Sequence, residues 1–495
     1  MKKLKALRSL RKELGAEVFL VGGTVRDLIR KKVPNDIDVV VRNVIPAEFE
    51  AFLRRRGKLS LVGKSFGVYL FRPRDSEESV EIAFPRTEVS TGDGHKDFVV
   101  TSDPALSIEE DSKRRDFTIN AMYLSIDDID DDGKFEKQNV IDFHNGLEHI
   151  RRRLVVAVGD PNDRIHEDPL RMLRATVLIA RTGYRLEGNT FAALKRHAKL
   201  ITTVPWERIG KEIVKIVKSD KPSRGFKTMS RTGLLALVLP ELAACVGSGQ
   251  NPKYHSYPVF EHIIYATDGA ASLTDNLAVR FGALCHDLGK APTREVRPGG
   301  DGPDDVSFHN HEIVSTKLAF KMFQRLKYSK DFTEEVIHLV RYHQYKYERT
   351  WTDKAVRRFI RKAGIRREHL DNLEFHPQFV LRMADRIGNE LKASLPVTPK
   401  QRDFQARIIE VYNASAAHSL RDLAVDGEDI KRELGLPAGP VIGRLMRFLF
   451  ESVEETPSMN NKEELFTAAH KFMEEEDGSD PADRVGASAS RKAAI

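Results

Sequence analysis

A glycine pair between two apolar runs, followed by two closely spaced acids, constrains the fold of this chain more than any other feature. An apolar run at residues 18–21 leads into the sequence GGTVRD at residues 22–27, and a second run begins at Ile37, between Asp36 and Asp38. Residues i and i+2 of a strand project to the same face, so these two acids should converge. The pattern predicts a strand, a glycine turn, a helix and a second strand that carries two carboxylates on one face.

The residue types in this segment suit a nucleotide bound together with Mg²⁺. Two converging carboxylates supply the oxygen ligands that Mg²⁺ prefers, alongside phosphate oxygens. Gly22 and Gly23 would let backbone N–H groups approach a triphosphate beside a helix N-terminus, where anions are favoured. Arg26 adds a forked, permanently charged donor. A glycine turn followed by a solvated acidic strand end would give the same pattern without function, and the further motifs weigh against that interpretation.

Length, charge and cysteine content limit the class of protein. At 495 residues the chain should hold several domains, because single cores seldom exceed about 250–300 residues. The net charge of +7 suits a nucleic-acid partner without proving one. The two cysteines, Cys245 and Cys285, form no CxxC pair, which argues against a disulfide framework or a zinc ribbon. Because we find no signal peptide and no apolar stretch of about 18 residues, we expect a cytoplasmic protein without membrane contact.

Hydrophobic periodicity divides the chain into an α+β head and a helical remainder. Residues 68–71 and 80–84 indicate strands. From about residue 146 strands are expected to vanish, and a 3.6-residue period predicts single helices over residues 163–181 and 223–239. The expected domains are a head at 1–145, a neck and body at 146–252, a further helical domain at 253–395, a helical tail at 396–474 and a disordered end at 475–495.

Two longer motifs indicate a family. The sequence KRRDFTINAM occupies residues 113–122, and EDPLR occupies residues 167–171. Together with the glycine and acid motifs, they resemble the class II tRNA nucleotidyltransferases, the CCA-adding family, which shares its head with bacterial poly(A) polymerases. The resemblance extends from about residue 18 to about residue 465. It implies an α+β multidomain fold, with a polymerase β-like nucleotidyltransferase head of mixed sheet and helices, an all-α neck and body, and a helical tail.

The resemblance also implies roles for individual residues. Asp36 and Asp38 would bind Mg²⁺ for two-metal phosphoryl transfer to the tRNA 3′-hydroxyl. A third acid is expected on a neighbouring strand; Glu81 is the first candidate and Asp116 the rival, and a structural ion pair is an open alternative for each. Val177 stands where the family often has another arginine, so one phosphate contact would be lost or supplied elsewhere. The expected nucleotide-binding residues are Gly22, Gly23, Arg26, Arg115, Asp116, Glu167, Asp168, Arg171 and Arg174.

Asp168 and Arg171 allow a physical explanation of base selection. Spaced i, i+3 near a helix start, they should share a face. Asp168 can accept from the exocyclic amine of cytosine or adenine, and Arg171 can donate to the neighbouring ring nitrogen or carbonyl oxygen. Uracil offers an oxygen in place of the amine, so a buried carboxylate facing it would be unpaired. The pair could therefore select C and A without a template strand, although its spacing alone also fits a surface salt bridge.

A second set of histidines and acids indicates a metal site in the helical part. The sequence LCHDLGK at residues 284–290 contains His286 and Asp287, and His262 and Asp385 lie before and after it. With the histidines at 309, 311 and 343, this order resembles an HD-family phosphohydrolase. Histidine and aspartate suit Mn²⁺, Ni²⁺, Co²⁺ or Mg²⁺, and residues about 100° apart on a helix could reach one ion. The resemblance implies phosphatase, 2′-nucleotidase or 2′,3′-cyclic phosphodiesterase activity, without indicating which.

The sequence favours CCA addition over four alternatives. A loop at residues 91–98, tail motifs at 422–429 and 436–443, and the HD set all resemble CCA-adding enzymes. They imply tRNA, CTP and ATP as partners, while the sequence leaves open whether the protein is a monomer or a homodimer. A poly(A) polymerase or an A-adding half-enzyme would share the head. A nucleotide phosphohydrolase with an RNA-binding head, or a non-catalytic RNA-binding scaffold, would not need the pair Asp36 and Asp38.

Overall fold

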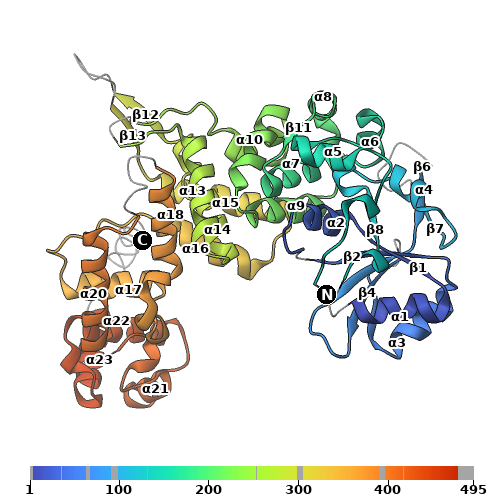
Figure 1. Ribbon diagram of the computed structural model, residues 1–495. Helices are drawn as coiled ribbons and strands as arrows, with labels where there is room; N and C mark the ends of the chain where they lie inside the picture. The colour runs from blue at the N-terminus through green and yellow to red at the C-terminus, as the bar shows by residue number, and fades with distance from the viewer. Residues whose placement is uncertain are drawn as a thin grey trace. The chain divides into compact units, whose positions relative to one another are not determined.

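The computed structural model of the chain forms two compact units (Figure 1). The first comprises Met1–Val340 and Ala384–Ala393, and the second comprises Arg341–Met383 and Ser394–Ile495. The chain therefore leaves the first unit, contributes to the second, and returns to the first for one short segment. The described residues are 4–34, 36–62, 67–90, 98–130, 132–251, 254–297, 305–389, 396–415 and 417–477.

The head is built on a seven-stranded mixed sheet, as the sequence predicts. Neighbouring strands are antiparallel except for one parallel pair in the centre, β2 (Asp38–Arg42) with β5 (Val80–Ala83). The strands predicted at 68–71 and 80–84 are both present. The strand order is β3 (Gly57–Val62), β4 (Val68–Pro73), β5 (Val80–Ala83), β2 (Asp38–Arg42), β1 (Glu17–Val21), β8 (Met122–Ser125) and β9 (Val140–Asp142).

A separate antiparallel pair, β6 (Arg86–Ser90) with β7 (Phe98–Ser102), adjoins the head. The loop predicted at residues 91–98 lies between these two strands. Apart from the backbone of Phe98, it falls outside the described residues, so its resemblance to the family loop stays a prediction.

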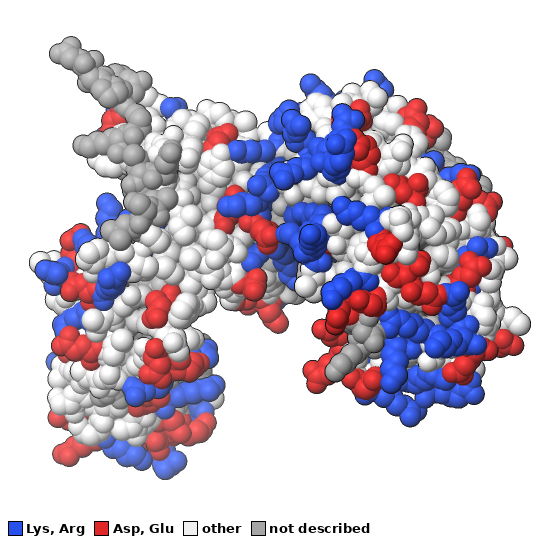
Figure 2. Space-filling model, in the orientation of Figure 1, with Lys and Arg blue, Asp and Glu red and all other residues white. Residues whose placement is uncertain are grey.

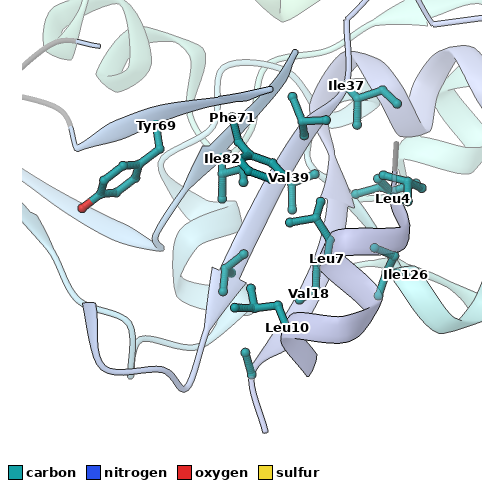
Figure 3. Packing of buried hydrophobic residues seen from close by; sticks show 14 of the residues in the cluster. Leu4, Leu7, Leu10, Val18, Ile37, Val39, Tyr69, Phe71, Ile82 and Ile126 are labelled. Carbon is teal, nitrogen blue, oxygen red and sulfur yellow. The ribbon is translucent and has the colours of Figure 1, made fainter. Parts of the chain in front are cut away.

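Alternation along the strands gives the sheet two different faces. On one face, side chains such as Val18, Val39 and Ile82 are buried against α1 (Lys5–Leu14) and α3 (Pro46–Arg54) (Figures 1 and 3). Each fully buried aliphatic side chain contributes about 1.5–3 kcal/mol, so this face anchors the sheet. Since Asp38 and Glu81 alternate with those side chains, they project from the opposite face, where α2 (Gly22–Ile29) begins.

Helices dominate the rest of the first unit, but they break where periodicity predicted continuity. The single helix expected at 163–181 is wrong, because α6 (Pro161–Glu167) ends before α7 (Arg171–Thr182) begins. Pro169 lacks an N–H and disfavours helical backbone at Asp168, which is extended at φ −143° and ψ 97°. The stretch at 223–239 likewise divides at a left-handed glycine, Gly233, into α10 (Pro222–Thr232) and α11 (Leu234–Val238). The neighbouring helices are α4 (Ile108–Lys113), α5 (Gly146–Arg152), α8 (Gly188–Arg196), α9 (Trp206–Val217) and α12 (Pro240–Ala243).

Strands also continue beyond residue 146, contrary to expectation. A parallel pair joins β10 (Leu154–Val155) to β11 (Arg185–Leu186), and an antiparallel pair joins β12 (Arg294–Arg297) to β13 (Asp305–Phe308). Strands of two to four residues are too short for periodicity to reveal. The helices of this part are α13 (Val259–Leu273), α14 (Leu277–Cys285), α15 (His311–Arg325) and α16 (Lys330–Arg341).

The second unit is helical, and its tail motifs have a structural explanation. Asp426 accepts the backbone N–H groups of Glu428 and Asp429 and so caps α21 (Gly427–Leu434), which ends at the left-handed Gly435. Contact of this segment with tRNA stays a prediction. In the described part of the chain, no helix is long and apolar enough to cross a membrane. The remaining helices are α17 (Asp353–Ala363), α18 (Pro377–Ile387), α20 (Pro399–Ala414), α21 (Gly427–Leu434), α22 (Pro440–Glu455) and α23 (Lys462–Asp477).

Candidate functional site

The glycine turn and the strand that carries the acids meet as the sequence predicts. Gly22 has a φ of 64°, in the left-handed region that favours glycine, and a Cβ at this position would lie 3.3 Å from Asp38 Oδ2. The helix α2 begins at this residue, so the N–H groups of its first turn, which have no partner within the helix, lie beside the Asp38 carboxylate. The turn therefore leaves room where a side chain would obstruct the approach of an anion.

Two acids from neighbouring strands lie together on the face opposite the core. Asp38 and Glu81 are direct partners in the parallel pairing of β2 with β5. Burial, followed by the negative charges of Glu81 and Asp36, raises the pKa of Asp38 to about 6, against the opposing effect of Arg115. Acids that repel one another in this way form a donor set that a divalent cation would stabilise.

Asp36 differs from the other two acids. It precedes β2 and is exposed, whereas Asp38 is half-buried at the strand start. Among the described residues, the ligand atoms of Asp36, Asp38 and Glu81 do not all lie within 4.8 Å of one another. The three acids therefore share one end of the sheet without forming a closed cage.

A buried acid that the sequence analysis missed holds the two arginines of the KRRDFTINAM motif. Asp111 is fully buried and accepts from Arg115 Nη2 at 3.0 Å, from Arg114 Nε at 2.9 Å and from the Tyr123 hydroxyl at 2.7 Å. Burial alone would raise the pKa of Asp111, but the guanidinium groups of Arg115 and Arg114 lower it to about 2. The carboxylate therefore stays ionised and fixes both arginines. Its i, i+3 and i, i+4 spacing from them was the available sequence signal.

Arg26 makes contacts that the sequence does not reveal. Its guanidinium donates to both carboxylate oxygens of Asp27, at 3.0 and 2.8 Å, and to Asn120 Oδ1 at 2.8 Å. The Arg26 side chain is buried, and its Nη2 would lie 3.5 Å from a Cβ placed on Gly23. These contacts brace the glycine turn against Asn120, while direct contact of Arg26 with a triphosphate stays a prediction.

The EDPLR segment lines the same cleft from the break between α6 and α7. Asp168 and Arg171 therefore do not share a helix face, contrary to expectation, because Asp168 lies in the extended turn before α7. Arg171 is buried and donates to Glu167 at 2.7 Å and to the Arg114 carbonyl at 2.8 Å. Arg208 of α9, which the sequence analysis missed, donates to Asp168 Oδ2 at 3.2 Å.

These elements enclose a cleft of about 670 Å³, a size typical of small-molecule sites. Most of the predicted residues line it, but Arg26, Asp36 and Glu167 are not part of its described wall. Asp116, the rival candidate for the third acid, also lines the cleft. Its Oδ2 atom lies 3.5 Å from Arg174 Nη1. The polar lining comprises Gly22, Gly23, Asp38, Glu81, Arg86, Arg114, Arg115, Asp116, Asn120, Asp168, Arg171, Arg174 and Arg208.

The four predicted ligands of the second site also come together within the first unit. The Nε2 atoms of His262 and His286 lie 3.2 Å apart, and His262 Nε2 lies 3.1 Å from Asp385 Oδ1 and 3.2 Å from Asp287 Oδ2. The expectation that His286 and Asp287 lie within a helix is wrong, because α14 ends at Cys285. The turn after the helix nevertheless directs both side chains toward His262.

Hydrogen bonds orient both histidine rings for metal binding. Nδ1 of His262 lies 3.2 Å from the Gly388 carbonyl, and Nδ1 of His286 lies 2.8 Å from the Ala283 carbonyl. A carbonyl only accepts, so each Nδ1 is the donor in this contact, and Nε2 is the ring nitrogen that faces the centre and could bind a metal. This donor set of two imidazoles and two carboxylates fits a divalent transition metal.

Two further residues contact Asp287. Lys290 Nζ lies 2.7 Å from Asp287 Oδ2, and His311 Nε2 lies 3.3 Å from Oδ1. Burial would raise the pKa of Asp287, but His286 and Lys290 hold it well below its ordinary value. Of the two nearby histidines in the sequence set, His311 is buried at this site whereas His309 is exposed.

Comparison with known families covers most of the first unit. Residues 18–156 match the family described as "Poly A polymerase head domain". Residues 183–246 match "Probable RNA and SrmB- binding site of polymerase A", and residues 259–394 match "HD domain".

Curated relatives match over much of their length. A protein of Xanthomonas campestris pv. campestris, named "Multifunctional CCA protein", is 33% identical over 422 residues, which cover 83% of this chain and 93% of the relative. A protein of the same name from Cupriavidus pinatubonensis is 34% identical over 332 residues, which cover 66% of this chain and 74% of the relative.

Solved structures share the fold. The CCA-adding enzyme of Bacillus stearothermophilus in complex with CTP matches with a TM-score of 0.60 at 19% identity, over 96% of this chain and 98% of that one. A complex of a CCA-adding enzyme with ATP matches with a TM-score of 0.52 at 16% identity, over 97% and 94% of the two chains. At such identities, these matches show the fold alone.

Proposed function

The chain belongs to the family of multifunctional CCA proteins, and from this premise we propose that it adds CCA to tRNA 3′ ends from CTP and ATP without a template. The observation that carries the proposal is the register of Asp38 opposite Glu81 beside the glycine turn, in one cleft with the EDPLR segment. Glu81 is a better candidate than Asp116 for the third carboxylate. Glu81 lies opposite Asp38 in the strand pairing, whereas Asp116 is paired with Arg174.

The residues of the cleft have different roles in the proposed phosphoryl transfer. Divalent ions, for which we propose Mg²⁺, would neutralise charge on the reacting phosphates when bound at Asp36, Asp38 and Glu81. The glycine turn and the N-terminus of α2 receive the triphosphate. Arg115, held by Asp111, supplies a fixed positive charge at the cleft wall and needs no reorganisation when the nucleotide enters.

We assign base selection to the extended turn between α6 and α7, together with the first residue of α7. Asp168 accepts from the exocyclic amine of cytosine or adenine, and Arg171 donates to the adjacent ring nitrogen or carbonyl oxygen. Arg171 is fixed by Glu167 and by the Arg114 carbonyl, so it cannot easily turn to suit uracil. Arg208 donates to the Asp168 carboxylate and so orients it in the same cleft.

We assign tRNA binding to the neck. Lys and Arg side chains gather over α7, α9 and α10 (Figure 2), and α9 and α10 lie within the part that matches an RNA-binding family. Positive charge of this kind contacts the phosphate backbone without reading sequence. A tRNA held here would present its 3′ end to the cleft that α7 and α9 help to line.

For the HD site we propose a second activity, hydrolysis of phosphate esters such as 2′,3′-cyclic phosphates. A divalent transition metal such as Mn²⁺, Ni²⁺ or Co²⁺ would be held by His262, His286, Asp287 and Asp385, and would supply an activated water. Lys290 places a positive charge beside these ligands, where a substrate phosphate would bind.

The test is incorporation into tRNA that lacks its 3′ CCA. The protein is incubated with Mg²⁺ and with CTP and ATP, separately and together, and the product ends are sequenced. Two C residues and then one A, with nothing further, are expected. Addition of A alone to a tRNA ending in CC would indicate an A-adding half-enzyme, and a long A tail would indicate a poly(A) polymerase. Absence of incorporation would contradict the proposal and leave the HD site as the main activity.

A further inference from the structure

Thr24 makes an unusual pair of hydrogen bonds at the start of α2. Its side chain is 1% exposed. The hydroxyl donates to the Asp36 carbonyl at 3.1 Å and accepts from the Asp38 N–H at 2.9 Å. A threonine within a helix ordinarily bonds to a carbonyl of its own helix, as Thr267 does with Ile263. Thr24 instead contacts the two residues that carry the predicted metal-binding carboxylates.

The sheet itself does not hold this segment on both sides. The pairing of β1 with β2 ends at Leu20 and Val39, one residue short of Asp38. On the other side, the Glu81 N–H donates to the Ile37 carbonyl at 2.9 Å, so β5 does extend along the segment. The Thr24 hydroxyl therefore takes the place of a ladder partner on the side where β1 has ended.

This arrangement joins the two halves of the cleft. Thr24 follows Gly22 and Gly23 directly, so the residue that holds the acid segment belongs to the first turn of the helix beside which the triphosphate is expected. Little separates the turn from the acid, because a Cβ on Gly22 would lie only 3.3 Å from Asp38 Oδ2. Any rotation of the segment at 36–38 would change the distance between the carboxylates and the glycine turn.

We propose that Thr24 is a positioning residue, which fixes the backbone at Asp36 and Asp38 so that both carboxylates bind the same divalent ion. This inference rests on the proposed nucleotidyl transfer. Without the hydroxyl, the Asp38 N–H loses its acceptor and the acid segment is held by β5 alone. The expected result is weaker binding of Mg²⁺, with a maximal rate that recovers when Mg²⁺ is raised.

The experiment measures CMP incorporation against Mg²⁺ concentration at saturating CTP and tRNA. Thr24→Val removes the hydroxyl and keeps nearly the same volume, whereas Thr24→Ser keeps the hydroxyl. We expect Thr24→Val to raise the Mg²⁺ concentration for half-maximal rate about fivefold, as the loss of one buried hydrogen bond would. Thr24→Ser should stay within about twofold of wild type. Thr267→Val, which removes another buried threonine hydroxyl outside the cleft, should leave the Mg²⁺ dependence unchanged.

Thermal unfolding of each variant separates positioning from a structural role. A lower melting temperature of Thr24→Val with an unchanged Mg²⁺ dependence would overturn the inference. If Thr24→Val does not fold, Thr24→Ala and Thr24→Ser differ only by the hydroxyl, and equal Mg²⁺ dependence in that pair would overturn it as well. If wild type itself incorporates no CMP, the proposed function fails; if wild type is active and the variants match it, only the role of Thr24 fails.

Discussion

The acids of the head cleft stand apart, whereas the ligands of the HD site already touch. In the head, Asp36 is exposed and Asp38 and Glu81 repel one another across two strands. In the HD site, His262 Nε2 lies within 3.2 Å of His286 Nε2 and of carboxylate oxygens. Both histidines are fully buried, and backbone carbonyls orient their rings.

The difference supports the proposal of two kinds of metal site in one unit. An open set of oxygen ligands suits a hard ion that arrives with a nucleotide and leaves with pyrophosphate. A closed set with oriented imidazoles suits a resident transition metal. We expect the arginine side chains, which Asp111 fixes, to be more rigid than the acidic side chains of the head cleft.

The largest effect is expected from removal of the head acids. Asp36→Ala combined with Asp38→Ala should lower CMP and AMP incorporation by about a thousandfold or more, because Glu81 alone would not replace both carboxylates as ligands of the divalent ions. Phosphate-ester hydrolysis at the HD site should be unchanged. Asp75→Ala combined with Glu77→Ala removes exposed acids at the same spacing in the same head and serves as the control. Retained incorporation in the first variant would remove the assignment of this site.

The reverse experiment breaks the HD site and leaves the head intact. Asp385→Asn should lower affinity for Ni²⁺ or Mn²⁺ by about a hundredfold, as loss of a charged ligand would, and abolish hydrolysis of 2′,3′-cyclic AMP. Metal content after dialysis and the rate of hydrolysis measure these effects. Incorporation of CMP should stay within twofold, and Asp331→Asn, at an exposed acid of α16, should change neither property. Full metal content in Asp385→Asn would contradict the ligand assignment.

Asp111→Asn tests whether the arginines are the rigid part of the head. Removing the charge beneath two guanidinium groups should lower the free energy of unfolding by about 3 kcal/mol at pH 7. The pKa of Asp111 is lowered in the folded protein to about 2 from 3.8. The ionised Asp111 therefore stabilises the folded protein fully above about pH 4, and this stabilisation is lost as pH falls toward 2. Over this range the difference in free energy of unfolding between wild type and Asp111→Asn should decrease by about 2 kcal/mol. Urea unfolding at a series of pH values measures this difference. A difference that does not change with pH would show that the charge of Asp111 is not its cause.

A smaller effect on activity is expected from substitution of Arg171, at the turn between α6 and α7. Arg171→Ala should reduce the preference for CTP over UTP, expressed as kcat/KM, by about tenfold, because the donor to the base is removed. Arg171→Lys keeps the charge without the fork and should recover only part of the preference. The HD site should again be unaffected. An unchanged preference in Arg171→Ala would show that other residues read the base.

Residues that act within one motif could be predicted from the sequence, and so could the mixed sheet. The i, i+2 spacing placed Asp36 and Asp38 at one strand end, and the order of histidines and acids named all four contacting residues of the HD site. The same reasoning joined α6 to α7 in one helix, because hydrophobic periodicity continues through Pro169 and hides the extended backbone at Asp168.

Partners that are distant in the chain and belong to no recognised motif could not be predicted. Arg208 reaches Asp168 from 40 positions away, and no spacing rule links them. Thr24 is an ordinary residue of a short motif until the fold brings it to Asp38. The contacts of Asp111 could be predicted only in part. The sequence shows its spacing from Arg114 and Arg115, but it does not show that the Asp111 side chain is buried.

The return of the chain to the first unit gives the HD site a consequence for folding. Gly388, whose carbonyl accepts from His262, lies 126 positions further along the chain, and Asp385 belongs to the same returning segment. An ion held by both His262 and Asp385 would close this long loop in the folded chain, and its binding free energy would add to the stability of the folded state. Unlike a disulfide, this cross-link is opened by a chelator and needs no oxidising environment to form.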